Sequence, residues 1–168
     1  MIVTASIPSS KPEQFRHEIT VLSPVSGSVV PRSNVNAPLF HSGSLGPGVC
    51  VMAQSNRILA PFPGKVVAMP EIGYELHFRA QNGLKLRIQV GESSPQLMGE
   101  RWQRLVQPDT NVPPGTPLAG FDPLWLNQHQ LSPVCIITVT NRRGIKALTS
   151  PNHTRLRAME DPLFTLYL

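Results

Sequence analysis

The sequence predicts an all-β protein, an antiparallel β-sandwich of many short strands with one or two short helices. Eighteen prolines and twelve glycines are spread through the 168 residues, so they divide the chain into short segments and exclude long helices. The apolar segments between these residues are rich in Val, Ile and Leu, which favour strands. One pair of segments also alternates apolar and polar residues on either side of a Gly-containing turn, as a hairpin does.

Ten segments are predicted as strands, because each is short, apolar and bounded by turn-forming residues. In chain order they are residues 18–23, 27–31, 48–54, 57–62, 64–69, 74–80, 84–90, 117–121, 134–140 and 163–168. Strands of this length and number are typical of a sandwich or a closed barrel.

Two short helices are predicted between these strands. The first covers residues 99–107 and ends before Pro108. The second covers residues 122–131, where Asp122 caps the helix and Pro123 takes the first helical position. Residues 1–18 contain two prolines and no sustained periodicity, so we expect a mobile tail ahead of one domain, residues 19–168.

The composition limits the location and chemistry of the protein. No apolar stretch approaches the roughly 20 residues that span a bilayer, and no signal-peptide pattern is present, so we expect a cytoplasmic protein without membrane insertion. Cys50 and Cys135 lie inside the apolar runs "GVCVM" and "PVCIITV", as buried free thiols do. No residues have metal-ligand spacing, and we expect neither a metal nor a cofactor.

The formal net charge of +5 raises the question of an acidic partner. The densest basic group is Arg142, Arg143 and Lys146, followed by Arg155 and Arg157. Aromatic residues that would stack on bases are not interleaved with it. The pattern therefore favours a solvated basic face over nucleic-acid binding, and such a face can also steer an acidic protein.

Residues 71–92, "EIGYELHFRAQNGLKLRIQVGE", are predicted to form a hairpin whose register follows from burial. A two-residue Asn82-Gly83 turn would place the apolar side chains of one strand opposite polar ones of the other. A three-residue loop that begins at Gln81 and has Gly83 in the left-handed conformation instead places all the apolar residues on one face. The resulting pairs are Ala80 with Leu84, Phe78 with Leu86, Leu76 with Ile88 and Tyr74 with Val90.

The polar residues of the hairpin then share the opposite face. His77 is a solvent-side residue in this register, with Arg87 as its neighbour. Tyr74 and Gln89 fall on opposite faces, unless Gly73 or Gly91 interrupts the alternation at the open end.

Motifs along most of the chain carry a family resemblance. They are, in order, "SPVSGSVV", "APLFHSGSLGPGVCV", "LAPFPGKVV", "NGLKLRIQVG", "LMGERWQRLVQPDTNVPPGTPLAGFD" and "SPVCIITVTN". From about residue 18 to residue 168 the chain resembles the glucose-class enzyme IIA of the bacterial phosphoenolpyruvate-dependent sugar phosphotransferase system. The resemblance implies an antiparallel β-sandwich, which agrees with the strand count.

The resemblance also implies a site in the hairpin. In that family one histidine accepts a phosphoryl group from the histidine-containing phosphocarrier and passes it to the sugar permease, and a second histidine binds the phosphoryl oxygens. Those positions hold Tyr74 and Gln89 here, and the threonine that orients the second histidine is replaced by Ile72. A phenol with a pKa of about 10 is a poor nucleophile, and its phosphate ester is too stable to be passed on. We therefore expect no catalytic residue at these positions and no phosphoryl relay.

Two other histidines are candidate substitute phosphoacceptors, His77 on the hairpin and His41 in the loop that resembles the rim of the family's site. Either would support the alternative hypothesis of a working component with an unconventional acceptor. Alternation places His77 on the solvent side, and His41 is also better explained as a surface residue. The zinc that the family can bind between its histidines is not expected either.

The function that remains is protein binding. The resemblance implies an apolar face around the site, formed here by Leu39, Phe40, Leu45, Tyr74 and Val90. We expect this face to bind cytoplasmic proteins, such as components of the phosphotransferase system or partners of unphosphorylated enzyme IIA, in a regulatory or scaffolding role.

A hypothesis of another class is a biotinyl or lipoyl carrier domain. "APFPGKVVAM" and "VPPGTPLAGF" contain the Pro-Gly turns that such domains use. These carriers need a lysine at a hairpin tip between methionines or acidic residues. Lys85, which adjoins Leu84 and Leu86, does not meet this condition.

Overall fold

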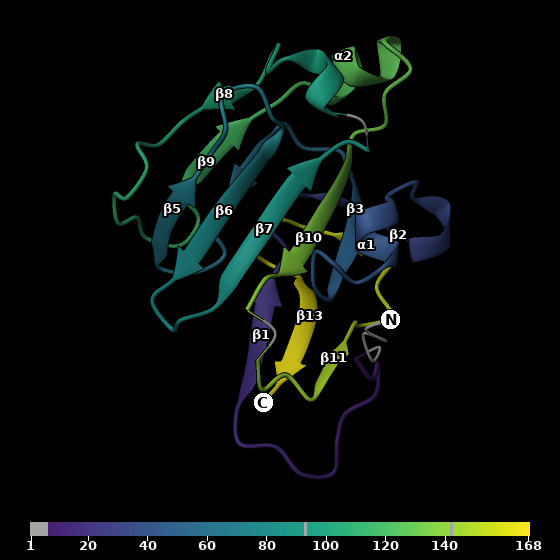
Figure 1. Cartoon of the computed structure of the whole chain (residues 1–168), viewed down its shortest axis with the longest axis vertical. Coiled ribbons are helices and arrows are strands. Elements are labelled where there is room, and N and C mark those ends of the chain that lie inside the picture. The colour runs from purple at the N-terminus through teal and green to yellow at the C-terminus, as the bar shows by residue number, and fades with distance from the viewer. Residues whose placement is uncertain (1–6, 93, 142) are drawn as a thin grey trace.

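The structure is a computed structural model that describes residues 7–92, 94–141 and 143–168. It is built mainly from antiparallel strands in three sheets (Figure 1). All ten predicted strands form, with ends that differ from the prediction by a few residues at most. The all-β prediction is therefore confirmed.

The largest sheet has seven strands. In spatial order they are β12 (Arg155–Leu156), β2 (Gly27–Val30), β3 (Gly48–Ala53), β10 (Val134–Val139), β7 (Lys85–Val90), β6 (Glu75–Ala80) and β5 (Gly64–Ala68). Every neighbouring pair is antiparallel. In Figure 1 this sheet runs across the middle of the molecule, with β5 at one edge.

Two three-stranded sheets complete the fold. One contains β1 (Glu18–Leu22), β13 (Pro162–Tyr167) and β11 (Ala147–Thr149), and the other contains β4 (Arg57–Leu59), β9 (Pro117–Gly120) and β8 (Gln103–Arg104), each in that spatial order. Strands β8, β11 and β12 were not predicted, because two or three residues are too few to show alternation.

The main core lies between the seven-stranded sheet and the two small sheets. Its members include Leu76 and Ile88 from the large sheet, Phe164 from β13, and Ile58 and Leu118 from the sheet of β4 and β9, all buried. A second, smaller core lies on the opposite, outward face of the large sheet. There Phe40 and Val35 cover Cys50, Val134 and Ile136. The large sheet is thus covered on both faces at β3 and β10.

Short helices connect the strands. They are the 3-10 helices η1 (Arg32–Asn34) and η2 (Ser94–Leu97) and the α-helices α1 (Pro38–His41) and α2 (Pro123–Gln128). The prediction for α2 is confirmed in detail, since the Asp122 carboxylate accepts a hydrogen bond from the Trp125 N–H at 3.0 Å. None of the helices among the described residues is long and apolar enough to cross a bilayer.

The predicted helix at residues 99–107 is wrong. The chain takes the left-handed conformation at Gly99 and again at Arg101, with φ of +78° and +60°, and two such residues stop an α-helix. Residues Gln103 and Arg104 then pair with β9. Sheet pairing has overridden a local helical preference.

Residues 7–17, the described part of the predicted tail apart from Glu18, lie along the sheet of β1, β13 and β11. The carbonyl of Pro8 accepts a hydrogen bond from the Leu148 N–H at 3.0 Å. The rings of Phe15 and Tyr167 meet edge to face at 5.0 Å, with the Lys11 ammonium above them. Residues 1–6 lie outside the described residues. The domain boundary and the mobility of the tail stay predictions.

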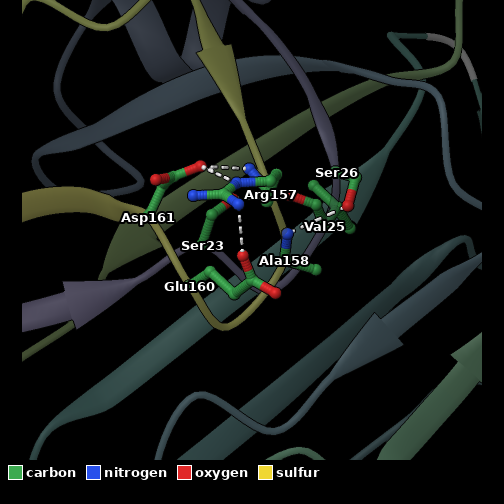
Figure 2. Close-up of polar contacts among 7 residues, drawn as sticks. All are labelled: Ser23, Val25, Ser26, Arg157, Ala158, Glu160 and Asp161. Carbon is green, nitrogen blue, oxygen red and sulfur yellow. Dashed lines mark hydrogen bonds and ion pairs between the residues drawn. The ribbon is translucent and has the colours of Figure 1, made fainter.

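The turn between β12 and β13 is held to the start of the domain by a group of polar contacts (Figure 2). The Asp161 carboxylate accepts hydrogen bonds from the backbone N–H and the guanidinium of Arg157, at 2.7 and 3.3 Å. Glu160 binds the same guanidinium at 2.8 Å. The Ser26 hydroxyl accepts from the Ala158 N–H at 2.9 Å, which ties this turn to the segment that leads into β2.

Cys50 and Cys135 are buried free thiols, as predicted. Burial raises the pKa of the Cys50 thiol to about 12 and raises that of Cys135 further. Neither thiol has the thiolate character that reactive cysteines need.

Candidate functional site

The hairpin of β6 and β7 has the predicted register. Leu76 lies opposite Ile88 and Phe78 opposite Leu86. The Val90 N–H donates to the Tyr74 carbonyl at 2.8 Å, which extends the pairing to the open end. Gly83 has a φ of +92°, the left-handed conformation required by the three-residue loop.

Tyr74, which the family resemblance aligns with the first histidine, is buried, with only 1% of its surface exposed. Its hydroxyl donates a hydrogen bond to the Glu100 carbonyl. Its ring packs against Trp102, with the ring centroids 5.1 Å apart. Burial, together with the nearby Glu100 carboxylate, raises the pKa of the Tyr74 phenol to about 12.

Gln89, which the resemblance aligns with the second histidine, points to the outward face of the sheet. Its side-chain oxygen accepts a hydrogen bond from the Arg87 guanidinium at 2.7 Å, and its amide nitrogen donates to the Gly91 carbonyl at 2.8 Å. Both ends of the Gln89 amide are therefore engaged in the hairpin. The prediction that Tyr74 and Gln89 lie on opposite faces is confirmed.

The outward face of the hairpin carries a small ionic network beside Gln89. Glu75 lies directly across from Gln89 on β6. Its carboxylate accepts from the Arg87 guanidinium at 2.8 Å and lies 3.4 Å from Nε2 of His77. His77 is half-buried and has Arg87 as its cross-strand partner, as the alternation predicted.

The exposed apolar face predicted around this site is wrong for three of its five residues. Phe40, Tyr74 and Val90 are each no more than 1% exposed. Leu39 is 61% exposed, and Leu45 is half-buried. Alternation had already placed Tyr74 and Val90 on the core side of the hairpin. Phe40 is buried because α1 turns it onto the outward face of the sheet.

Ile72 and His41, the remaining predicted site residues, are at the surface. Ile72 is 56% exposed. The ring Nε2 of His41 donates to the Val35 carbonyl. The loop that carries His41 is fixed beside the hairpin, because the Asn36 N–H donates to the Glu92 carboxylate at 3.1 Å.

Sequence reasoning did not assign Glu75 and Arg87 a role in the site. The alternation of β6 and β7 placed both on the same face as His77 and Gln89. Alternation does not predict which of several polar neighbours bond to one another, because side-chain torsions decide that.

The fold and the hairpin define a β-sandwich protein with a site at the open end of one hairpin. A family model described as "phosphoenolpyruvate-dependent sugar phosphotransferase system, EIIA 1" matches residues 19–145. The chain belongs to this enzyme IIA family.

Curated relatives include single enzyme IIA components and longer proteins. The PTS system glucose-specific EIIA component of Oceanobacillus iheyensis is 25% identical over 151 residues, which cover 90% of this chain and 92% of the relative. The PTS system glucose-specific EIIBCA component of Corynebacterium glutamicum is 32% identical over 123 residues, which cover 73% of this chain and 18% of the relative. The chain spans only about a fifth to a quarter of the length of such multi-component relatives.

A solved structure supports the fold. Glucose permease IIA from Mycoplasma capricolum matches with a TM-score of 0.74 at 20% sequence identity, over 89% of this chain and 96% of that chain. This similarity confirms the antiparallel β-sandwich.

Proposed function

We propose that the protein is a glucose-class enzyme IIA-like module that has lost histidine phosphoryl transfer and acts by binding other proteins, in a regulatory or scaffolding role. The observation that carries this proposal is the burial of the Tyr74 phenol, which packs against Trp102 and is hydrogen-bonded to the Glu100 carbonyl.

The chemistry of a phosphoryl relay needs a nucleophile that is neutral near pH 7 and forms a bond that is easily transferred. With a pKa of about 12, the Tyr74 phenol holds its proton more tightly than a free phenol does. Gln89 brings no positive charge, and Arg87 and Gly91 already bind its amide. Neither position therefore supports the acceptance of a phosphoryl group.

The direct test is a labelling experiment with phosphoenolpyruvate, enzyme I and the phosphocarrier. We expect the full chain to remain unlabelled under conditions in which an enzyme IIA with both histidines is fully labelled. Acid-labile label on any residue of this chain would contradict the proposal.

A second candidate function is a working component that uses His77. The Glu75 carboxylate lies 3.4 Å from Nε2 of His77, so it can orient the imidazole and leave Nδ1 free. The Arg87 guanidinium, bound to the same carboxylate, can bind phosphoryl oxygens. This candidate predicts acid-labile label that His77→Gln removes and His41→Gln leaves in place. The reverse result would make His41 the acceptor.

The binding surface proposed for the module is the accessible part of the face around the hairpin's open end. Leu39 and Ile72 are exposed there, and Leu45 is half-buried. A phosphoryl group would bring about −1.5 to −2 charges to this face in a relative that carries one. Without it, the face permanently matches the unphosphorylated form, and the partners would be those of that form or components of the phosphotransferase system.

A matched pair of variants tests the surface. Leu39→Ser removes an exposed leucine (61%) from the proposed surface, and Leu124→Ser removes one of similar exposure (67%) from α2. In competition with a histidine-bearing enzyme IIA for its cytoplasmic partner, we expect Leu39→Ser to weaken binding at least about fivefold and Leu124→Ser to have little effect. Equal effects would place the contact elsewhere.

A further inference from the structure

Three basic residues lie side by side on the outward face of the large sheet, in the half formed by β5, β6 and β7. Arg79 on β6 lies directly opposite Lys65 on β5 and directly opposite Lys85 on β7. With strands about 4.8 Å apart, the backbones of Lys65 and Lys85 are about 10 Å apart with Arg79 between them. His77 and Arg87 form a second pair two residues along the same strands. We call these five residues the cationic face.

The acidic groups near this face neutralise only part of it. Asp109 lies 3.7 Å from the Lys65 ammonium, and Glu75 binds Arg87 at 2.8 Å. Arg79 and Lys85 are exposed, and neither has an acidic partner among the residues that the structure describes. The two free cations are cross-strand neighbours.

This arrangement is unfavourable for the sheet itself. Like charges directly opposite each other on neighbouring strands destabilise the pair, whereas opposite charges stabilise it. Solubility requires polar side chains on this face but does not require one sign of charge. The repulsion would be relieved by carboxylates supplied from outside.

We propose that the cationic face is a docking surface for an acidic segment of another protein, which places carboxylates on Arg79 and Lys85. Charge complementarity selects the partner. The bulge in β5 leaves Val67 and Ala68 exposed beside His77, so apolar contacts are available at the rim of the same surface. This surface does not include Leu39, and the proposal stands independently of the partner expected there.

A protein partner fits this face better than a nucleic acid does. Single-stranded nucleic acids are bound by cationic grooves that also present Phe, Tyr or Trp side chains for stacking, and the one such residue of β5, β6 and β7 is Phe78, which is buried.

The experiment measures binding of poly-L-glutamate to the full chain at low ionic strength, with oligo-dT and phosphatidylglycerol vesicles as alternative probes. The double variant Arg79→Gln/Lys85→Gln removes both free cations. The control double variant Arg16→Gln/Arg155→Gln removes the same charge from exposed positions outside the face. We expect the first to weaken binding of poly-L-glutamate about tenfold and the control about twofold or less.

Stability provides a second readout of the same surface. Because Arg79 is flanked by two cations, Arg79→Gln should leave the Tm unchanged or raise it. If the two double variants weaken the binding of poly-L-glutamate equally, the binding depends on the net charge of the chain and not on this face, and the proposal is overturned. A stronger dependence of oligo-dT or vesicle binding on Arg79 and Lys85 would also overturn it, as would a clear fall in Tm for Arg79→Gln.

Discussion

Tyr74 is a packing residue, although the family resemblance aligns it with a reactive histidine. Its ring packs against Trp102 and its hydroxyl binds the Glu100 carbonyl, so it links the hairpin to the segment before β8. A reactive side chain must be accessible to solvent and to its reaction partner, whereas a packing side chain must be buried. The two requirements cannot be met by one side chain in one orientation.

Truncation at this position should therefore reduce stability. We expect Tyr74→Ala to lower the free energy of unfolding by about 3 kcal/mol, since a buried aromatic side chain and its hydrogen bond are both lost. Urea denaturation followed by circular dichroism measures this. Ile72→Ala, two residues away and exposed, should stay within about 0.5 kcal/mol of the parent. A stable Tyr74→Ala variant would mean that the ring is not part of the core.

The Asp161 carboxyl gives a prediction for how the stability of the fold depends on pH. The hydrogen bonds from the Arg157 N–H and guanidinium lower the pKa of the Asp161 carboxyl below its ordinary value of 3.8. A carboxyl whose pKa is lower in the folded state stabilises the fold above its unfolded pKa, and this contribution is lost as the pH falls through the folded pKa. The stability difference between the parent and Asp161→Asn should be constant above about pH 5 and shrink below about pH 4. A difference that grows on acidification would contradict this cause.

At the scale of elements, the predictions succeeded where one face of an element is buried and the pattern is long. The hairpin register followed from eight apolar residues, and Asp122 and Pro123 marked the start of α2. The helix expected at residues 99–107 failed, because left-handed residues and pairing with β9 decide that segment. Such pairing depends on a strand that is distant in the sequence.

A further prediction at this scale concerns residues 7–17, which contact β11 and β13. These contacts predict that the amide of Leu148, which donates to the Pro8 carbonyl, is protected from hydrogen exchange. Phe15→Ala removes the ring that packs on Tyr167 and should speed exchange at Leu148 several-fold. The Ile137 amide, in the middle of the large sheet, serves as the control and should not change. Unprotected Leu148 in the parent chain would favour the mobile tail that the sequence predicts.

At the scale of the whole molecule, the sequence predicted the fold class and family and misjudged the surface. The basic group densest in the sequence does not form one free face among the described residues: Lys146 binds the Gln14 carbonyl and Arg157 is held by Glu160 and Asp161, while Arg142 lies outside those residues. The cationic face instead gathers Lys65, Arg79 and Lys85 from three strands. Sheet register brings these residues together, and a count along the chain does not show it.

The proposed function predicts a molecule with one charge state at its binding surface. In a histidine-bearing enzyme IIA, the phosphoryl group adds about −1.5 to −2 charges to the contact, so partner binding changes with the supply of phosphoenolpyruvate. Under this proposal, the buried phenol of Tyr74 and the engaged amide of Gln89 accept no phosphoryl group. We expect the affinity for a partner of unphosphorylated enzyme IIA to be the same when enzyme I and the phosphocarrier are supplied with phosphoenolpyruvate or with pyruvate. The histidine-bearing enzyme IIA, measured in parallel, should lose affinity with phosphoenolpyruvate alone. If the affinity of this chain also falls with phosphoenolpyruvate, the same measurement on His77→Gln separates two explanations. The variant abolishes the response if His77 is a substitute acceptor, and it leaves the response unchanged if the phosphoenolpyruvate acts on the partner.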